Sequence, residues 1–452
     1  MSEKYELVII GGGPGGLAAA ELTAAKKKRV LIIEKDGWGG TCTHRGCIPT
    51  KALLTCSKFY ADLKKLKRVG INIAESSIDF SAIKKHQQQI VKVSALGAQK
   101  VLTDARVETK QGAGEIISSS EVRFTDSSGK SEIFSAQNIV IAWGSVSQML
   151  PGINLSDRVL TSDGILNLNL LPPSIIIVGG SFIGVEFATF FAELGAKVTI
   201  VELLDRIIPN EDQECADLLQ QEMTRMGIAI HTSTKLESLK DTGSGVVMQA
   251  QKDGKQLEIS ADYTLLCTGR KPLLNSEELN NLGIEYTNGG IKIDKNMMTN
   301  VAGVYAVGDV TGGMMLAHRA TQQAKVAAGF ICQANDFIYD ENFIPSVVYS
   351  HPQIARVGYT QKRAEAEGLS IEVVKSNYSA NIIARAELLG QGFVKAIFHQ
   401  DKLIGATIVG DDAAELIAPL ALAISNELTR KQLRAWVIPH PTLSEIFAPL
   451  VG

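Results

Sequence analysis

The chain has 452 residues, of which 45% are hydrophobic and 21% charged, as is typical of a folded protein with two to four domains. Its net charge of −3 gives no electrostatic basis for binding nucleic acid, and no stretch is apolar over the length that a membrane-spanning helix needs. Six scattered cysteines do not form a disulfide framework and the N-terminus shows no signal-peptide pattern, so we expect a cytoplasmic protein.

The first segment predicts a strand, a glycine-rich loop, a helix and a second strand. Tyr5 to Ile10 and Val30 to Ile33 are the predicted strands, and the helix is expected from Leu17 to Lys27. The loop between them has the G-x-G-x-x-G spacing, formed by Gly11, Gly13 and Gly16. The first glycine turns the chain, the second admits a pyrophosphate and the third lets the helix pack on the strand. Glu34 closes the second strand, where it would hold a ribose hydroxyl.

A pair of cysteines follows this unit. Cys42 and Cys47 are separated by four residues and stand just before a helix predicted from Pro49 to Lys64. A helix N-terminus favours a thiolate. The pair could be a zinc half-site with His44, a structural disulfide or a redox dithiol. No second cysteine pair completes a zinc site.

The strand–loop–helix–strand unit occurs a second time. Ser174 to Val178 and Val198 to Val201 are its strands, and Gly179 to Gly184 form its loop. The spacing from first glycine to closing acid is the same in both copies, Glu202 being the second acid. Ser181 stands where the second glycine is expected. Two dinucleotide sites in one chain predict two nucleotides that meet, a flavin and a nicotinamide.

Glu202 bears on the choice of nicotinamide. A carboxylate at this position accepts a hydrogen bond from a 2′-hydroxyl and repels a 2′-phosphate. Leu203 and Leu204 offer no basic group, although Arg206 is near. We therefore expect NAD rather than NADP.

The rest of the chain adds two further candidate groups. A strand over Val304 to Val307 leads to Asp309 and then to a helix that opens at Leu316, an arrangement that suits a flavin. From residue 342 onward, strands alternate with two helices. Near the end, His440 is followed by Glu445, an acid able to orient and stabilise the imidazole.

With these pieces assembled, the chain resembles the flavin-dependent pyridine nucleotide–disulfide oxidoreductases over essentially its full length. The motifs that carry the resemblance are the two glycine loops with their acids, Gly39-Gly40-Thr41-Cys42 to Cys47-Ile48-Pro49-Thr50-Lys51, Thr268-Gly269-Arg270, Val307-Gly308-Asp309 and His440-Pro441-Thr442 to Glu445. The resemblance implies an α/β fold with two doubly wound, Rossmann-like dinucleotide-binding domains and a C-terminal α+β dimerisation domain. The implied boundaries are FAD 1–146 and 271–337, NAD 147–270 and dimerisation 338–452.

The resemblance also implies roles for particular residues. Cys47 would face the flavin, Cys42 would exchange with substrate, and His440 with Glu445 would act as the base, reaching the site from the other subunit of a homodimer. Lys51 and Glu186 would pair beside the flavin. The remaining implied contacts are Gly11, Gly13, Gly16, Glu34, Lys51, Gly114, Asp309 and Ala317 with FAD, and Gly179, Gly184, Glu202, Leu236 and Gly269 with NAD. No metal is implied.

The implied reaction oxidises dihydrolipoamide carried on a protein, the lipoyl-bearing domain of a 2-oxo acid dehydrogenase complex or a glycine cleavage carrier protein. Electrons would pass from the dithiol through FAD to NAD. The alternatives are glutathione-, mercury- or coenzyme A disulfide-type reductases of the same fold, and a non-catalytic flavoprotein subunit. Glutathione reduction calls for basic residues at Glu202 and Leu203, and mercury reduction calls for a cysteine pair near the C-terminus; neither is present.

Three features depart from the pattern of the resemblance. Thr43-His44-Arg45 places charge between the cysteines, and Arg45 could lower a thiol pKa. Trp143 stands beside the expected flavin site. Gln322 and Gln323 replace residues that are often acidic. These features bear on redox tuning and substrate choice rather than on the fold.

Overall fold

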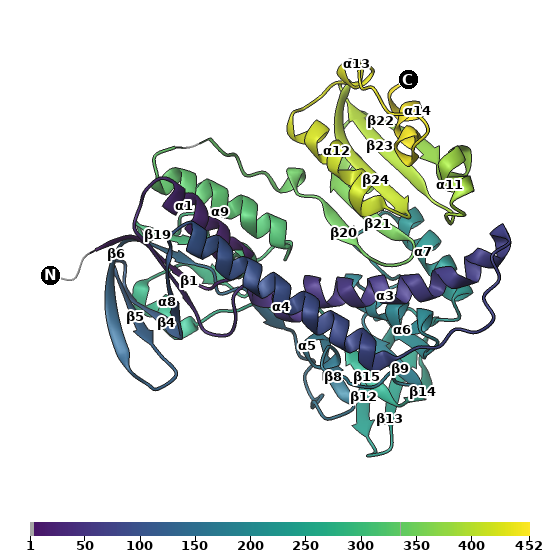
Figure 1. Ribbon diagram of the computed structural model, residues 1–452, viewed down its shortest axis with the longest axis horizontal. Helices are drawn as coiled ribbons and strands as arrows, with labels where there is room; N and C mark the ends of the chain where they lie inside the picture. Colours follow the sequence, from purple (N-terminus) through teal and green to yellow (C-terminus); the bar gives the residue numbers. More distant parts are fainter. Residues whose placement is uncertain (1–3, 335) are drawn as a thin grey trace. The chain divides into compact units, whose positions relative to one another are not determined.

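The structure, a computed structural model, describes residues 4–334 and 336–452, which divide into two units (Figure 1). Each unit is assembled from three separate segments of the chain. The first unit takes the described part of Met1–Ala52, together with Lys84–Gln148 and Gly269–Tyr339. The second unit takes Leu53–Ile83, Met149–Thr268 and Asp340–Gly452.

A seven-stranded sheet forms the centre of the first unit. Strand β1 (Tyr5–Ile10) pairs in parallel with β2 (Val30–Glu34) on one side and with β6 (Ser131–Ile141) on the other. The sheet continues with β3 (Glu108–Gln111) beside β2, β19 (Val304–Ala306) beside β6, and the antiparallel strands β5 (Glu121–Thr125) and β4 (Ala113–Ser118). Strand β1 is buried on both faces, as the continuous apolar run of a parallel strand predicts.

Helices and short ribbons complete the first unit. Helix α1 (Pro14–Ala25) packs against α9 (Ala317–Ile331), where small residues such as Gly15 and Ala320 let the two helices approach closely. The other elements are α2 (Gly40–Arg45), α4 (Phe80–Asp104), whose first turn belongs to the second unit, α8 (Ser276–Leu282), and the pairs β7 (Ser145–Ser147) with β16 (Arg270–Pro272) and β17 (Tyr286–Thr287) with β18 (Gly290–Ile291).

The second unit contains a parallel sheet of five strands. In spatial order these strands are β11 (Ala229–His231), β10 (Lys197–Val201), β9 (Ser174–Val178), β15 (Tyr263–Leu266) and β8 (Val159–Thr161). Helix α6 (Phe182–Glu193) follows β9 and is buried over most of its surface. Also present are α5 (Ser162–Ile165), α7 (Gln213–Arg225) and the antiparallel sheet of β12 (Thr234–Asp241), β13 (Val246–Lys252) and β14 (Lys255–Ala261).

The C-terminal part of the second unit is a mixed layer of sheet and helices. Its five antiparallel strands run in the order β20 (Ser346–Val348), β21 (Gln353–Gly358), β24 (Lys402–Gly410), β23 (Phe393–His399) and β22 (Ile371–Asn377). The apolar helix α12 (Ala413–Ser425) packs on β21 and β24. Smaller helices are α10 (Gln361–Ala366), α11 (Ile382–Ala386), α13 (Arg430–Leu433) and α14 (Ala448–Val451).

The predicted fold class is confirmed, and the main differences lie at helix ends. Helix α1 begins at Pro14 rather than at Leu17, because proline is preorganised for the first helical turn. It ends before Lys27, which adopts a positive φ of 60°. The domain boundaries implied by the resemblance stay a prediction. No helix in the part of the chain that the structure describes has the length and hydrophobicity needed to cross a membrane.

Candidate redox-active site

The two cysteines of the motif are brought together by a short helix and the start of a long one. Cys42 lies within α2 and Cys47 is the first residue of α3 (Cys47–Leu66). The turn that starts α2 requires glycine at position 39, where φ is +96° and a Cβ would lie 2.2 Å from the Thr43 hydroxyl oxygen. The two thiols form a hydrogen bond with one another. The predicted location of Cys47 at a helix N-terminus is confirmed.

The groups around the two cysteines shift the pKa of the Cys42 thiol. The hydrogen bond with Cys47 and burial raise the pKa of the Cys42 thiol, while the Lys51 ammonium acts in the opposite direction. Lys51 lies one turn beyond Cys47 on the same helix. The hydrogen bond and burial therefore favour the protonated form of the Cys42 thiol.

The charged residues between the cysteines are engaged elsewhere. The Arg45 guanidinium lies 3.1 Å from an Asp36 carboxylate oxygen, and His44 Nε2 lies 3.0 Å from the Trp38 carbonyl oxygen. The Thr43 hydroxyl contacts the Ser94 hydroxyl at 3.2 Å. The Arg45 charge is thus offset by a carboxylate, and Arg45 is not among the groups that shift the Cys42 pKa.

The glycines of the first loop are of two kinds: some are required by the packing of the backbone, and one leaves space for a ligand. A Cβ at Gly11 would lie 2.2 Å from the Ala142 carbonyl oxygen, and one at Gly16 would lie 1.9 Å from the Gly11 carbonyl oxygen. At Gly13, by contrast, φ is −75° and a Cβ would meet nothing within 4 Å. The protein fold alone does not require glycine at position 13. The open space in front of the α1 N-terminus therefore fits a pyrophosphate that approaches the backbone closely.

The acid of the first unit is held by backbone N–H groups. One Glu34 carboxylate oxygen accepts the Gly12 N–H at 2.5 Å, and the other accepts the Asp36 N–H at 2.6 Å. The oxygen that Asp36 contacts also accepts the Gly37 N–H at 3.2 Å, so its two lone pairs are used. The oxygen that Gly12 contacts keeps a lone pair that can accept a ribose hydroxyl.

The second glycine loop repeats this geometry in the second unit. Glu202 accepts the Gly180 N–H at 2.6 Å and the Leu204 N–H at 2.8 Å. A Cβ at Gly179 would lie 2.4 Å from the Cys267 carbonyl oxygen, and one at Gly184 would lie 1.9 Å from the Gly179 carbonyl oxygen. Ser181 occupies the place that Gly13 has in the first loop, with φ −79°.

Arg206, the nearby cation noted in the sequence, is committed to other partners. Its guanidinium donates to the Gln213 side chain at 2.8 Å and to the Pro209 carbonyl oxygen at 3.0 Å. These contacts hold it within its own turn, so Glu202 remains the charged group at the end of β10.

Asp309 belongs to a hydrogen-bond network with Ser145 and Arg270, two residues that the sequence motifs contain but do not connect to it. Its carboxylate accepts the Ser145 hydroxyl at 2.6 Å, and the Ser145 oxygen accepts the Arg270 Nε–H at 2.9 Å. The loop before Asp309 is fixed by Gln323, which is fully buried and accepts the Gly308 N–H at 2.7 Å. Ser145 and Gln323 therefore support the Asp309 loop, a role that their contacts reveal and their sequence position does not.

The other predicted cofactor contacts lie on both units. In the first unit, Ala317 opens α9, where the first N–H groups lack helical partners. Gly114 on β4 faces Ile10, and Gly269 turns with φ +100° between β15 and β16. In the second unit, Leu236 on β12 packs on the core beside the parallel sheet.

His440 and Glu445 form the expected pair. His440 Nδ1 lies 2.8 Å from a Glu445 carboxylate oxygen, whose other oxygen accepts the Thr442 N–H at 3.0 Å. The hydrogen bond from His440 and that from Thr442 hold the pKa of Glu445 below its usual value. The His440 side chain is 74% exposed, so its Nε2 is available to a thiol outside the chain.

Glu186 lies inside the second unit on α6. It is 3% exposed, and its carboxylate accepts the Tyr349 N–H at 3.0 Å. Lys51 belongs to the first unit, and its pairing with Glu186 stays a prediction.

The chain belongs to the pyridine nucleotide-disulphide oxidoreductase family. Residues 5–324 match that family, and residues 344–451 match its dimerisation domain. It is therefore an oxidoreductase with FAD and NAD as cofactors, and its C-terminal segment is one that forms dimers.

Curated relatives cover nearly the whole chain. It is 35% identical to a dihydrolipoyl dehydrogenase of Chlamydia pneumoniae over 99% of this chain and 96% of the relative. It is 36% identical to a dihydrolipoyl dehydrogenase of Chlorobaculum parvum over 98% of this chain and 96% of the relative.

Two solved structures superpose on nearly the whole chain. LpdA from Mycobacterium tuberculosis superposes with a TM-score of 0.92 at 26% identity, over 98% of both chains. A copper(II) complex of the HOCl-induced flavoprotein disulfide reductase RclA from Escherichia coli superposes with a TM-score of 0.87 at 29% identity, over 99% of both.

Proposed function

We propose that the protein acts as a dihydrolipoyl dehydrogenase, which oxidises a dihydrolipoyl group and reduces NAD⁺. The observation that carries this proposal is the contact between the Cys42 and Cys47 thiols at the start of α3. Full-length relatives with this activity in their names support the same substrate class.

In the proposed reaction, His440 of the partner subunit takes the proton from one dihydrolipoyl thiol. Its Nδ1 is held by Glu445, so the proton goes to Nε2. The substrate thiolate attacks Cys42, the Cys42–Cys47 bond breaks, and Cys47 leaves as a thiolate.

The second substrate thiol then displaces Cys42 and closes the lipoyl disulfide. The substrate has lost two electrons and two protons, and the dithiol has gained the two electrons. The raised pKa of Cys42 favours its protonation on release. The glycine loop before α1, Glu34 and Asp309 would hold FAD, which would supply the two-electron transfer that links the dithiol to NAD⁺.

The nicotinamide site is proposed to prefer NAD⁺ over NADP⁺. The Glu202 carboxylate is fixed at the end of β10, where it accepts a ribose hydroxyl and repels a phosphate. The Arg206 guanidinium is directed to Gln213 and to the Pro209 carbonyl oxygen.

A second candidate is reduction of another disulfide, which the likeness to the reductase RclA favours. A substrate panel separates the two. The purified protein is assayed with dihydrolipoamide and NAD⁺ or NADP⁺, and with glutathione disulfide and coenzyme A disulfide and either reduced nucleotide. We expect turnover of dihydrolipoamide with NAD⁺. Faster turnover of another disulfide with NADPH would reject both the substrate and the nucleotide assignment.

The proposed setting is a cytoplasmic homodimer. Each active site would combine the dithiol of one subunit with the His440–Glu445 pair of the other. The proposed partner is a lipoyl-bearing domain of a 2-oxo acid dehydrogenase complex or a glycine cleavage carrier protein. Assays of NAD⁺ reduction with lipoylated and unlipoylated domains check this, since only the reduced lipoylated form should be turned over.

A further inference from the structure

Helix α6 carries two buried carboxylates on one face. Glu186 and Glu193 are seven residues apart, which is about two helical turns, and they are 3% and 6% exposed. A buried carboxylate is costly unless it is paired, so each needs a partner.

One short segment supplies partners to both carboxylates. Following β20, the Tyr349 N–H donates to Glu186 at 3.0 Å, and His351 Nδ1 lies 2.7 Å from Glu193. The segment is itself tied down by the Ser350 hydroxyl, which donates to the Pro352 carbonyl oxygen at 2.7 Å. Residues 349–352 therefore contact α6 at two points, two turns apart.

His351 joins this segment to the C-terminal sheet. Its Nε2 lies 3.0 Å from the Asp411 carboxylate, which follows β24 and also accepts the Gly390 N–H at 3.3 Å. Both ring nitrogens face carboxylates, so both donate only when the ring is an imidazolium. The two carboxylates raise the pKa of His351 to about 9 despite its burial.

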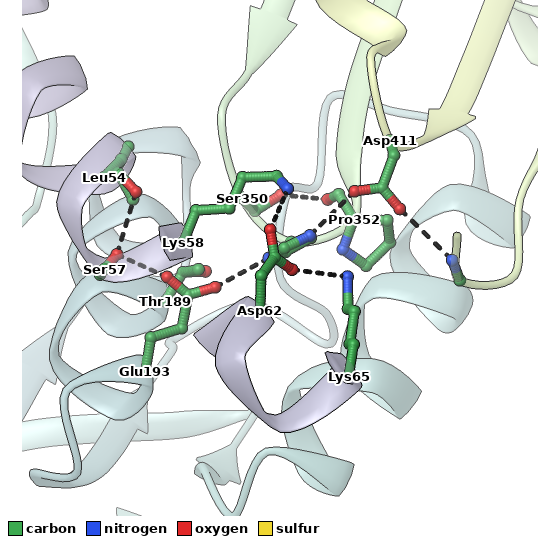
Figure 2. A network of polar contacts seen from close by, with 12 residues as sticks. Leu54, Ser57, Lys58, Asp62, Lys65, Thr189, Glu193, Ser350, Pro352 and Asp411 are labelled. Carbon is green, nitrogen blue, oxygen red and sulfur yellow. Dashed lines mark hydrogen bonds and ion pairs between the residues drawn. The ribbon is translucent and has the colours of Figure 1, made fainter. Parts of the chain in front are cut away.

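Helix α3 is tied to the same place. The Ser57 hydroxyl donates to the second oxygen of Glu193 and also lies 3.1 Å from the Leu54 carbonyl oxygen (Figure 2). Four segments distant in sequence thus meet around the His351 imidazole, which is 19% exposed: α3, α6, the loop after β20 and the end of β24.

We propose that His351 is a positioning residue for Glu186. By bridging Asp411 and Glu193, it fixes α6 and the 349–352 segment against each other, and so holds the Tyr349 N–H on the Glu186 carboxylate. The inference rests on the proposed function together with the sequence-based prediction that Glu186 lies beside the flavin, and it assigns a role to residues outside that predicted site.

The test compares four variants of the holoenzyme. His351→Gln cannot bridge two carboxylates, and Glu193→Ala removes one anchor. Glu193→Gln keeps an oxygen that accepts the imidazolium proton, so it is the conservative rescue. His399→Gln is the matched control, because its ring lies on the same unit and its Nδ1 is hydrogen-bonded to the Ser370 carbonyl oxygen at 2.8 Å.

Three quantities are measured: hydrogen exchange of the peptide that contains Tyr349, kcat against KM with dihydrolipoamide and NAD⁺, and thermal stability. We expect His351→Gln and Glu193→Ala to speed exchange at Tyr349 at least about tenfold. We expect them to lower kcat by about ten- to a hundredfold, with KM for NAD⁺ unchanged. Glu193→Gln and His399→Gln should behave like wild type.

A double variant separates positioning from stability. In His351→Gln/Glu193→Gln one of the two carboxylates that lose the imidazolium is neutralised, so part of the lost stability should return while kcat and the exchange rate do not. A fall in stability alone, with kcat and Tyr349 exchange unchanged in the folded protein, overturns the inference, as does a fall in kcat without faster exchange.

The readouts also keep the two proposals apart. If wild type does not oxidise dihydrolipoamide, the proposed substrate is wrong. The positioning role is then decided by the exchange of Tyr349 and by the rate at which NADH reduces the flavin in the same four variants.

Discussion

At the scale of single residues, two thiols in contact have different surroundings. Cys47 begins a 20-residue helix, whose N-terminal N–H groups and dipole stabilise negative charge. Cys42 is the thiol whose pKa is raised by its hydrogen bond to Cys47 and by burial. This asymmetry suits a dithiol in which one sulfur exchanges with substrate and the other keeps the charge.

Replacing Cys47 by serine should abolish this chemistry without emptying the cofactor site. A hydroxyl cannot form the disulfide, so dihydrolipoamide-dependent NAD⁺ reduction should fall by at least about 10³-fold. Flavin content should stay at the wild-type level, because the glycine loop of α1 is untouched.

Cys56→Ser is the matched control for that variant. Cys56 lies further along α3, and burial alone raises its thiol pKa. Its replacement should leave turnover unchanged. Near-normal turnover in the Cys47 variant would refute the dithiol assignment.

His440→Ala should separate the two halves of the reaction. Without the imidazole, reduction of the enzyme by dihydrolipoamide should slow by about 10²–10⁴-fold, the usual contribution of a positioned base. Reduction by NADH does not use this base and should be unaffected. Stopped-flow absorbance of the flavin measures both rates, with His399→Ala as the control; equal loss in both half-reactions would argue against a base at position 440.

At the scale of elements, the two strand–glycine–helix units show which glycines serve the fold. At Gly16 a Cβ would collide with a backbone carbonyl, so the fold requires glycine there. At Gly13 a Cβ would meet nothing within 4 Å, so the fold does not require glycine there. The sequence pattern treats both alike, and the structure separates them.

Alanine at these two positions should therefore give opposite results. Gly16→Ala places a methyl group against the Gly11 carbonyl and should destabilise the protein by about 1–3 kcal/mol, as overpacking does. Gly13→Ala should leave the melting temperature of the flavin-free protein unchanged and weaken FAD binding about tenfold. Flavin-to-protein ratio and thermal unfolding measure the two effects; equal melting losses in both would contradict this assignment.

Local pattern was sufficient to predict most of these elements. Strand β1 was predicted with its observed ends, and the dithiol was placed at a helix start, because hydrophobic runs and glycine spacing are local signals. The bond from Ser145 to Asp309 was not predicted. It joins residues far apart in the chain, and no periodicity encodes such a contact.

At the scale of the whole molecule, the hydrogen-bonded group of Ser57, Glu193, His351 and Asp411 in the second unit makes the free energy of unfolding depend on pH. His351 has its pKa raised to about 9 from 6.5, and Asp411 has its pKa lowered to about 2 from 3.8. The charged residues around the His351 ring come from three parts of the chain. They are Glu193 of α6, Asp411 after β24, and Lys58, Asp62 and Lys65 of α3.

The raised pKa of His351 sets the direction of the effect. Its stabilising contribution is complete below pH 6.5 and is lost as pH rises through about 9, because the unfolded chain releases this proton first. The Asp411 contribution is present above pH 3.8 and is lost as pH falls towards 2.

We therefore expect the gap in melting temperature between wild type and His351→Gln to be widest near pH 6 and to narrow above pH 9. Differential scanning calorimetry across this range measures the gap, with His399→Gln as the reference. A gap that does not change with pH would mean that the ring is neutral in the folded protein.

This hydrogen-bonded group could not be predicted from the sequence. Its members lie at positions 57, 193, 351 and 411, and each of them alone is an ordinary serine, acid or histidine. Only the packing of their elements makes them one group.

The double hydrogen bond of Glu202 has a consequence for attempts to re-engineer coenzyme choice. A designer who wants this protein to use NADPH would replace the acid with a basic residue. That exchange would also release the Gly180 and Leu204 N–H groups, which the acid now satisfies. Selectivity and loop architecture are therefore coupled in one side chain, and a successful redesign must supply new acceptors for both amides along with the cation.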